Sequence, residues 1–174
     1  MLSFGQSFTF TSSGGSNFSS VSSPQPIIAP FWDDVDVLKG GTIFYRQDFN
    51  SSVANQVQQE IYTQFPDVGF FYPSLVFVAT WDRVAAFSSS FRGRFNTFQA
   101  IIASDGGRTF VRFNYGNIQW GGSSTLIGVS AGDGVNFITH SASLSSSVLL
   151  LDNTATTYRI DGNFHYMFII FKNV

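Results

Sequence analysis

The sequence predicts a mainly β fold, an antiparallel β-sandwich-like arrangement of two layers with one packed α-helix at about residues 52–64. Three observations carry this prediction. Short runs rich in β-branched and aromatic residues recur along most of the chain. Turn residues such as Asp105-Gly106-Gly107 separate these runs. A single segment repeats its apolar residues at helical spacing instead, and many short strands with one helix are typical of a sandwich.

The N-terminal third of the chain is expected to contain two strands and a loop. Residues 2–10 alternate loosely between apolar and polar side chains, which predicts a strand. Residues 11–25 are rich in Ser and Gly and are expected to form a loop. The pair Gly40-Gly41 marks a turn, and the β-branched and aromatic residues 42–46 predict the strand that follows it.

The predicted helix begins near residue 52, where Val53, Val57 and Ile61 recur every four residues. Pro66 is expected to end it, because proline cannot continue a helix. After the helix we expect one strand after another, and the clearest hairpin turns at Asp105-Gly106-Gly107. The expected strands are residues 75–81, 97–103, 110–115, 126–129, 135–139, 148–151, 157–160 and 167–171. No linker interrupts this series, so residues 1–174 are expected to form a single domain.

The composition excludes several classes of function. Charged residues make up 11% of the chain, against about 25% in a typical soluble domain. The net charge of −2 provides no basic face for nucleic acid. Cysteine is absent, which excludes disulfides, thiolate metal sites and a cysteine nucleophile. No apolar run is long enough to span a membrane.

Three neighbouring aspartates form the candidate metal site. Asp33, Asp34 and Asp36 could bind calcium, which prefers several carboxylate and carbonyl oxygens. Their spacing does not fit an EF-hand loop, so the site would need a further ligand from Asp105 or Asp133. The alternative is structural, with these side chains capping turns and pairing with an arginine such as Arg46. In an alternating strand Asp34 and Asp36 would share a face and Asp33 would point away. No other cofactor is expected.

The sequence contains no recognisable catalytic motif. The two histidines, His140 and His165, have no second histidine at metal-ligand spacing. Asp82 and Asp133 could form a glycosidase-type pair only if the fold brought their carboxylates within several ångströms. We therefore expect a protein that is not an enzyme.

Aromatic residues offer a carbohydrate platform as an alternative function. Phe31-Trp32 and Trp81 could stack on the apolar face of a sugar. Aromatic residues within β-rich runs are more often core, so a buried position is the expected one. Trp120, which precedes two glycines, is expected near an edge, and Arg92-Gly93-Arg94 is expected to be a solvated loop.

Several ordered segments carry a resemblance to a known family. They are IAPFWDDVD at 28–36 with GTIFYR at 41–46, ATWDRV at 79–84, and NTFQAIIASDG at 96–106 with FNYGNIQW at 113–120. In order and spacing they resemble the motifs of the nidogen-like (NIDO) family of extracellular domains, and the resemblance spans about residues 2–170. Family members carry an N-terminal strand region that is interrupted here at Met1, so this domain is expected to lack that strand, which would leave an unpaired sheet edge.

The resemblance implies an extracellular location and a structural or adhesive role without enzymatic activity. Extracellular matrix or cell-surface proteins are the implied partners. Two alternatives stay open: a subunit that self-assembles into filaments through strand edges, and a carbohydrate-binding domain. Asn17 and Asn50 begin N-glycosylation sequons in segments predicted to be loops.

Overall fold

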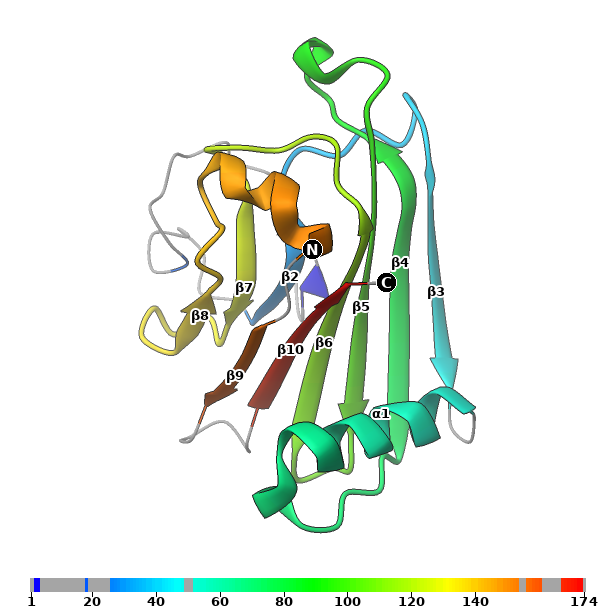
Figure 1. Ribbon diagram of the computed structural model, residues 1–174, viewed down its shortest axis with the longest axis vertical. Helices are drawn as coiled ribbons and strands as arrows, with labels where there is room; N and C mark the ends of the chain where they lie inside the picture. The colour runs from blue at the N-terminus through cyan, green and yellow to red at the C-terminus, as the bar shows by residue number, and fades with distance from the viewer. Residues whose placement is uncertain are drawn as a thin grey trace.

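A computed structural model describes residues 2–3, 18, 26–48, 52–153, 156–160 and 167–173. Two sheets and one helix dominate the structure (Figure 1). In chain order the elements are β1 (Leu2–Ser3), β2 (Ile27–Trp32), β3 (Thr42–Asp48), α1 (Ser52–Gln64), the 3-10 helix η2 (Pro66–Val68), β4 (Leu75–Ala85), the 3-10 helix η3 (Ser89–Phe91), β5 (Phe95–Ser104), β6 (Thr109–Asn117), β7 (Leu126–Ser130), β8 (Phe137–Thr139), the 3-10 helix η4 (Ser146–Asn153), β9 (Thr156–Ile160) and β10 (Met167–Asn173).

The strands form a small sheet in the order β1-β2-β7-β8 and a large sheet in the order β3-β4-β5-β6-β10-β9. Every pairing is antiparallel except that of β6 with β10, which is parallel. The predicted antiparallel sandwich with one packed helix is therefore confirmed, with one parallel pair added.

The main core lies between the two sheets. We call the face of the large sheet that meets the small sheet its inner face. Along β4 the residues Ala79 and Trp81 point to this face and are buried, as are Phe98 and Ala100 of β5. Phe31 of β2 packs against them from the small sheet, with its ring centroid 5.3 Å from that of Phe98. Aromatic side chains thus fill the space between the two layers.

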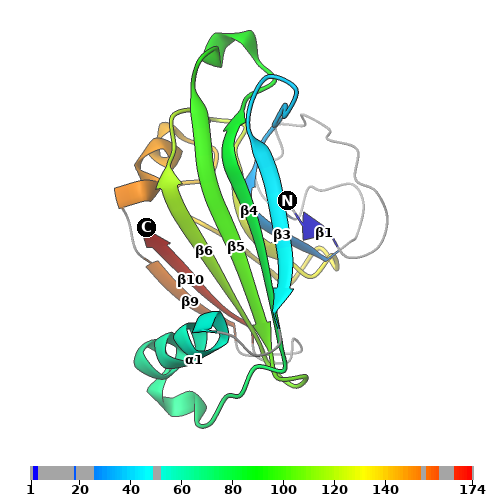
Figure 2. The same ribbon diagram turned by 90° about the vertical axis from the view of Figure 1, so that its right-hand side faces the viewer.

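A second core lies on the outer face of the large sheet, beneath α1. The alternate residues of β4, Val76 and Val78, point to this face and meet Val57 and Ile61 of the helix. Figure 2 shows α1 crossing one end of the large sheet, with the rest of the outer face uncovered in that view. Every second residue of the strand and every fourth residue of the helix are apolar and point toward each other, so the two elements bury these side chains between them.

The turn into β3 depends on Gly41. Its backbone has φ +90°, and a Cβ atom there would lie 2.5 Å from the carbonyl oxygen of Arg83. Only glycine allows this conformation and this close approach. The predicted turn at Gly40-Gly41 is thereby explained, and it sets β3 alongside β4 with Thr42 opposite Asp82.

Most predicted strands are confirmed with shifted ends, but residues 148–151 are not a strand. They lie within η4, where Val148 and Leu151 are buried. These two residues are three apart, which matches the three-residue turn of a 3-10 helix. The predicted strand at residues 2–10 is described only at Leu2–Ser3, and residues 4–10 lie outside the described residues. The predicted loop at 11–25 lies outside them too, except for buried Phe18.

Candidate functional site

The most exposed apolar surface on a regular element is β3, the edge strand of the large sheet. Its residues Ile43, Phe44 and Tyr45 expose 45%, 55% and 77% of their surface. The strand pairs with β4 along seven residues and has no described strand on its other side. An edge of this length leaves a row of backbone N–H and C=O groups open to a further strand.

The small sheet does not extend far enough to cover β3. In register, Ile43 lies opposite Trp81 and Tyr45 opposite Ala79, so all four point to the inner face. Trp81 and Ala79 are buried, whereas Ile43 and Tyr45 are exposed. The ring of Tyr45 stacks on Phe77 with centroids 6.3 Å apart. The edge therefore carries an uncovered apolar overhang on the inner face and exposed Phe44 on the outer one.

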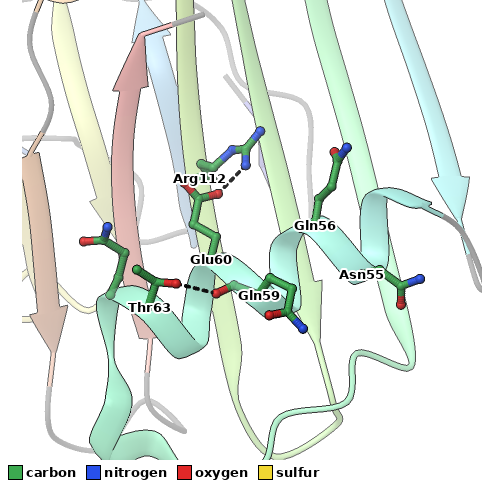
Figure 3. Close-up of a pocket in the computed structure, with 7 residues that line it drawn as sticks. Asn55, Gln56, Gln59, Glu60, Thr63 and Arg112 are labelled. Carbon is green, nitrogen blue, oxygen red and sulfur yellow. Dashed lines mark hydrogen bonds and ion pairs between the residues drawn. The ribbon is translucent and has the colours of Figure 1, made fainter.

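An open groove of about 720 Å³ lies where α1 crosses the outer face (Figure 3). Among the residues that line it, Glu60 of α1 forms an ion pair with Arg112 of β6. This pair joins the helix to the sheet. The groove is lined by Asn55, Gln56, Gln59, Glu60, Thr63, Gln64 and Arg112, all of which are polar.

The candidate calcium residues follow β2 rather than form a strand. The Asp33 carboxylate accepts hydrogen bonds from the hydroxyls of Thr125, at 2.5 Å, and Ser124, at 3.2 Å. Asp36 accepts the Leu38 N–H and pairs with Lys39 at 3.3 Å. The cation that pairs with Asp36 is thus Lys39, whereas the structural alternative named an arginine such as Arg46.

The structural role that we considered for these aspartates therefore describes Asp33 and Asp36. Among the described residues, no group of three or more His, Cys, Asp or Glu could hold a metal ion. Calcium binding at Asp33, Asp34 and Asp36 stays a prediction.

The two distant aspartates that were considered as further ligands serve their own turns. Asp105 accepts the N–H groups of Gly107 and Arg108 and pairs with the Arg108 guanidinium at 2.7 Å. Burial opposes ionisation of Asp105, but these hydrogen bonds and the guanidinium outweigh it and lower its pKa. Hydrogen bonds from Asn136 and Val135 lower the pKa of Asp133. Both carboxylates are held as turn caps.

The fold does not bring the glycosidase-type pair together. Asp82 lies on β4 opposite Thr42, on the outer face of the large sheet, while Asp133 lies in the turn between β7 and β8 of the small sheet. His140 is buried, and its Nδ1 accepts the Ala142 N–H at 3.1 Å. His165 and the sequon residues Asn17 and Asn50 lie outside the described residues.

The tryptophans are core residues and form no surface platform. Trp32 and Trp81 are buried, as expected for aromatic residues in strands. Trp120, expected near an edge, is instead 1% exposed. Its position is fixed because its indole N–H donates to the Val84 carbonyl and its backbone pairs with buried Asn96. These buried contacts outweigh the turn tendency of the glycines that follow Trp120. Arg92-Gly93-Arg94 is exposed, as predicted.

Sequence reasoning missed two exposed aromatic features. One is the β3 edge, and the other is the loop after α1, where Phe70 and Tyr72 are exposed and their rings stack at 6.3 Å. The run Ile43-Phe44-Tyr45 was the available signal. Three consecutive apolar residues in a strand place apolar side chains on both faces. The sequence does not reveal which of those faces another layer covers.

Comparison with known proteins identifies the family. The model of the nidogen-like domain matches residues 2–168, almost the whole chain. The chain belongs to the nidogen-like (NIDO) domain family. Alpha-tectorin of Mus musculus is 30% identical over 156 residues, which cover 78% of this chain and 7% of that protein. Nidogen-2 of Mus musculus is 39% identical over 97 residues, which cover 52% of this chain and 7% of that protein. Mucin-4 of Homo sapiens is 32% identical over 124 residues, which cover 64% of this chain and 2% of that protein.

The family assignment confirms the expected extracellular location of this NIDO domain. The chain spans less than a tenth of the length of the alpha-tectorin and nidogen relatives that it matches. No solved structure matches it. Within the described residues, no helix is both long and apolar enough to cross a membrane.

Proposed function

We propose that this NIDO domain is a non-enzymatic structural module of the extracellular matrix that joins other proteins by strand addition at β3. The observation that carries the proposal is the seven-residue edge with exposed Ile43, Phe44 and Tyr45. In strand addition, main-chain hydrogen bonds provide affinity and alternate side chains provide specificity. Both are available along β3.

A non-enzymatic role agrees with the environment of the titratable groups. Asp105, Asp133 and His140, whose pKa values are shifted, each make contacts within their own turn. Perturbed groups at catalytic sites instead converge on one cleft. The carbohydrate-binding alternative loses the platform that it would need, because Phe31, Trp32 and Trp81 are buried.

Self-assembly into filaments is the second candidate. Among the described strands, β3 and β9 form the two edges of the large sheet, and pairing of β3 with β9 of the next copy would continue without closing. Low surface charge favours such association.

The first prediction concerns retention on matrix. Replacing Ile43 and Tyr45 by lysine places charges on the overhang and should reduce retention of the chain on decellularised matrix at least tenfold, because charged edges resist strand pairing. The measurement is the bound fraction of purified chain at matched concentrations.

The matched control replaces Val135 and Leu150, which are exposed away from β3, by lysine and carries the same added charge. We expect the control to bind like the wild type, with both variants giving the wild-type circular dichroism spectrum. Equal retention of the two variants would show that β3 is not the binding edge.

A further inference from the structure

The partner that fits β3 can be specified further, on the basis of the proposed function of this edge. We propose that the strand added to β3 is β3 of a second copy of this chain. The two strands pair antiparallel, with Tyr45 of one copy opposite Tyr45 of the other across a two-fold axis. The two large sheets then join into one continuous sheet. The partner surface that this requires is already present in the structure, since β3 is itself an extended strand and no other described strand pairs with it beyond β4.

The backbone of β3 selects an extended partner. Its outward N–H and C=O groups can be satisfied together only by water or by another strand. In the small sheet the edge strand β8 is too short for this role, because it has three residues. Short edge strands are one way in which proteins prevent edge pairing, and β3, with seven residues, lacks this protection.

The layers of the domain restrict the register. Successive side chains of a strand point to opposite faces, so a shift by one residue exchanges the two faces. In β3, Thr42, Phe44 and Arg46 share the outer face with Thr80 and Val78 of β4. An antiparallel pairing keeps the helix layers of both copies on one side only if outer-face residues pair with outer-face residues. The two-fold axis must therefore pass between the two copies of one residue, so that this residue lies opposite itself.

Among such registers, the one centred on Tyr45 pairs all seven residues. It sets Thr42 opposite Asp48 and Phe44 opposite Arg46 on the outer face, and Ile43 opposite Gln47 on the inner face. No like charges face each other. A register centred on Arg46 would oppose two guanidinium groups, which is destabilising. A register centred on Phe44 would leave Gln47 and Asp48 unpaired.

The same register covers the apolar overhang. Tyr45 already stacks on Phe77, and Tyr45 of the second copy would lie directly across the axis. The four rings then form one row on the inner face, where aromatic cross-strand pairs are favourable. Because the contact uses the same surface on both copies, it closes as a dimer and leaves β3 unavailable for further growth.

Single cysteine variants test this register, because the chain contains no cysteine. In the proposed dimer the two Cα atoms at position 45 lie about 4.5–5.5 Å apart, within the range of about 4.4–6.8 Å that a disulfide requires. We therefore expect Tyr45→Cys to form a disulfide-linked dimer under mild oxidation, at least tenfold faster than Ile43→Cys. Ile43 is the matched control, since it shares the inner face and is exposed but lies opposite Gln47. Light scattering of the wild type should show a mass that rises from 19.2 kDa to twice that value and then stays constant.

Three results would overturn the proposal: a constant mass of 19.2 kDa, equal disulfide rates at positions 43 and 45, or a mass that increases without limit. The last would indicate a filament. These results are separable from failure of the proposed function. The wild type could be monomeric while the lysine variant at Ile43 and Tyr45 still loses matrix retention. That result would support strand addition at β3 and show that the partner is a different protein.

Discussion

Asp33 illustrates how a single carboxylate stabilises the end of the small sheet. It lies directly after β2 and accepts hydrogen bonds from Ser124 and Thr125, which directly precede β7. Thr125 is fully buried and its Oγ1 also accepts the Gly122 N–H at 2.9 Å. A carboxylate in this position joins two segments that are some ninety residues apart in the chain. Removing it leaves two hydroxyls without their charged acceptor.

We predict that Asp33→Ala lowers the free energy of unfolding by about 1–3 kcal/mol, the usual cost of removing a hydrogen-bonded partner of buried groups. Urea denaturation measured in calcium and in a chelator should give the same loss. Asp34→Ala, which changes the neighbouring candidate ligand, serves as the control and should cost less. A calcium-dependent rise in wild-type stability that both variants abolish would instead support the predicted calcium site.

His140 connects pH to the stability of the small sheet. Burial lowers the pKa of this imidazole below its ordinary value of 6.5. Its Nδ1 accepts the Ala142 N–H and its backbone N–H donates to Ile127 of β7 at 2.8 Å. Protonation of Nδ1 would remove the first of these bonds. The folded chain therefore favours the neutral ring.

We predict that stability falls as the pH drops below 6.5. In that range the unfolded chain binds a proton that the folded chain does not, so acid favours unfolding until the pH falls below the folded pKa. The measurement is the urea midpoint between pH 7.5 and 5. In His140→Gln, which has no titrating ring, the decline over this range should be smaller. An identical pH profile in wild type and variant would contradict the assignment.

At the scale of elements, the large sheet is covered by different layers at different places. The small sheet covers the inner face around Trp81 and Phe98, and α1 covers one end of the outer face through Val57 and Ile61. Neither layer covers Ile43, Phe44 or Tyr45 of β3, which are exposed. The exposed edge therefore results from how far its neighbours extend and not from anything unusual in the strand itself.

We predict that Ile61→Ala destabilises the domain by about 2–5 kcal/mol, because this side chain is fully buried between α1 and the large sheet. Gln56→Ala on the exposed side of the same helix should change stability by less than about 0.5 kcal/mol. Thermal or urea unfolding of both variants provides the comparison. A similar small effect of both substitutions would show that α1 is not firmly packed on the sheet.

For the whole molecule, the two cores on opposite faces of the large sheet make one sandwich with a helix added outside. Tyr115 of β6 joins the layers, since its hydroxyl donates to the Pro30 carbonyl of β2 at 2.7 Å. Burial raises the pKa of Tyr115 well above its ordinary value of 10.0, which keeps this hydroxyl a donor at physiological pH. The two layers are thus joined at their centre by a buried hydrogen bond, and the exposed edge at β3 lies at the periphery.

The sequence by itself determined the elements and the family. Helical spacing located α1, alternation located most strands, and the ordered motifs pointed to the nidogen-like family that the comparisons confirmed. These features depend on local patterns, which a chain carries without reference to its neighbours. Burial of the aromatic strand residues Trp32 and Trp81 could also be expected from their surroundings.

Only the tertiary structure decided which surfaces were left uncovered. Residues 148–151 became a 3-10 helix because Val148 and Leu151 had to reach the core, and Trp120 became buried through its bonds to Val84 and Asn96. The Asp33 contacts join residues that no local pattern relates. Exposure of Tyr45 depends on where the small sheet stops. Coverage of a side chain is set by distant segments, and for that reason no local sequence pattern predicts the exposed edge at β3.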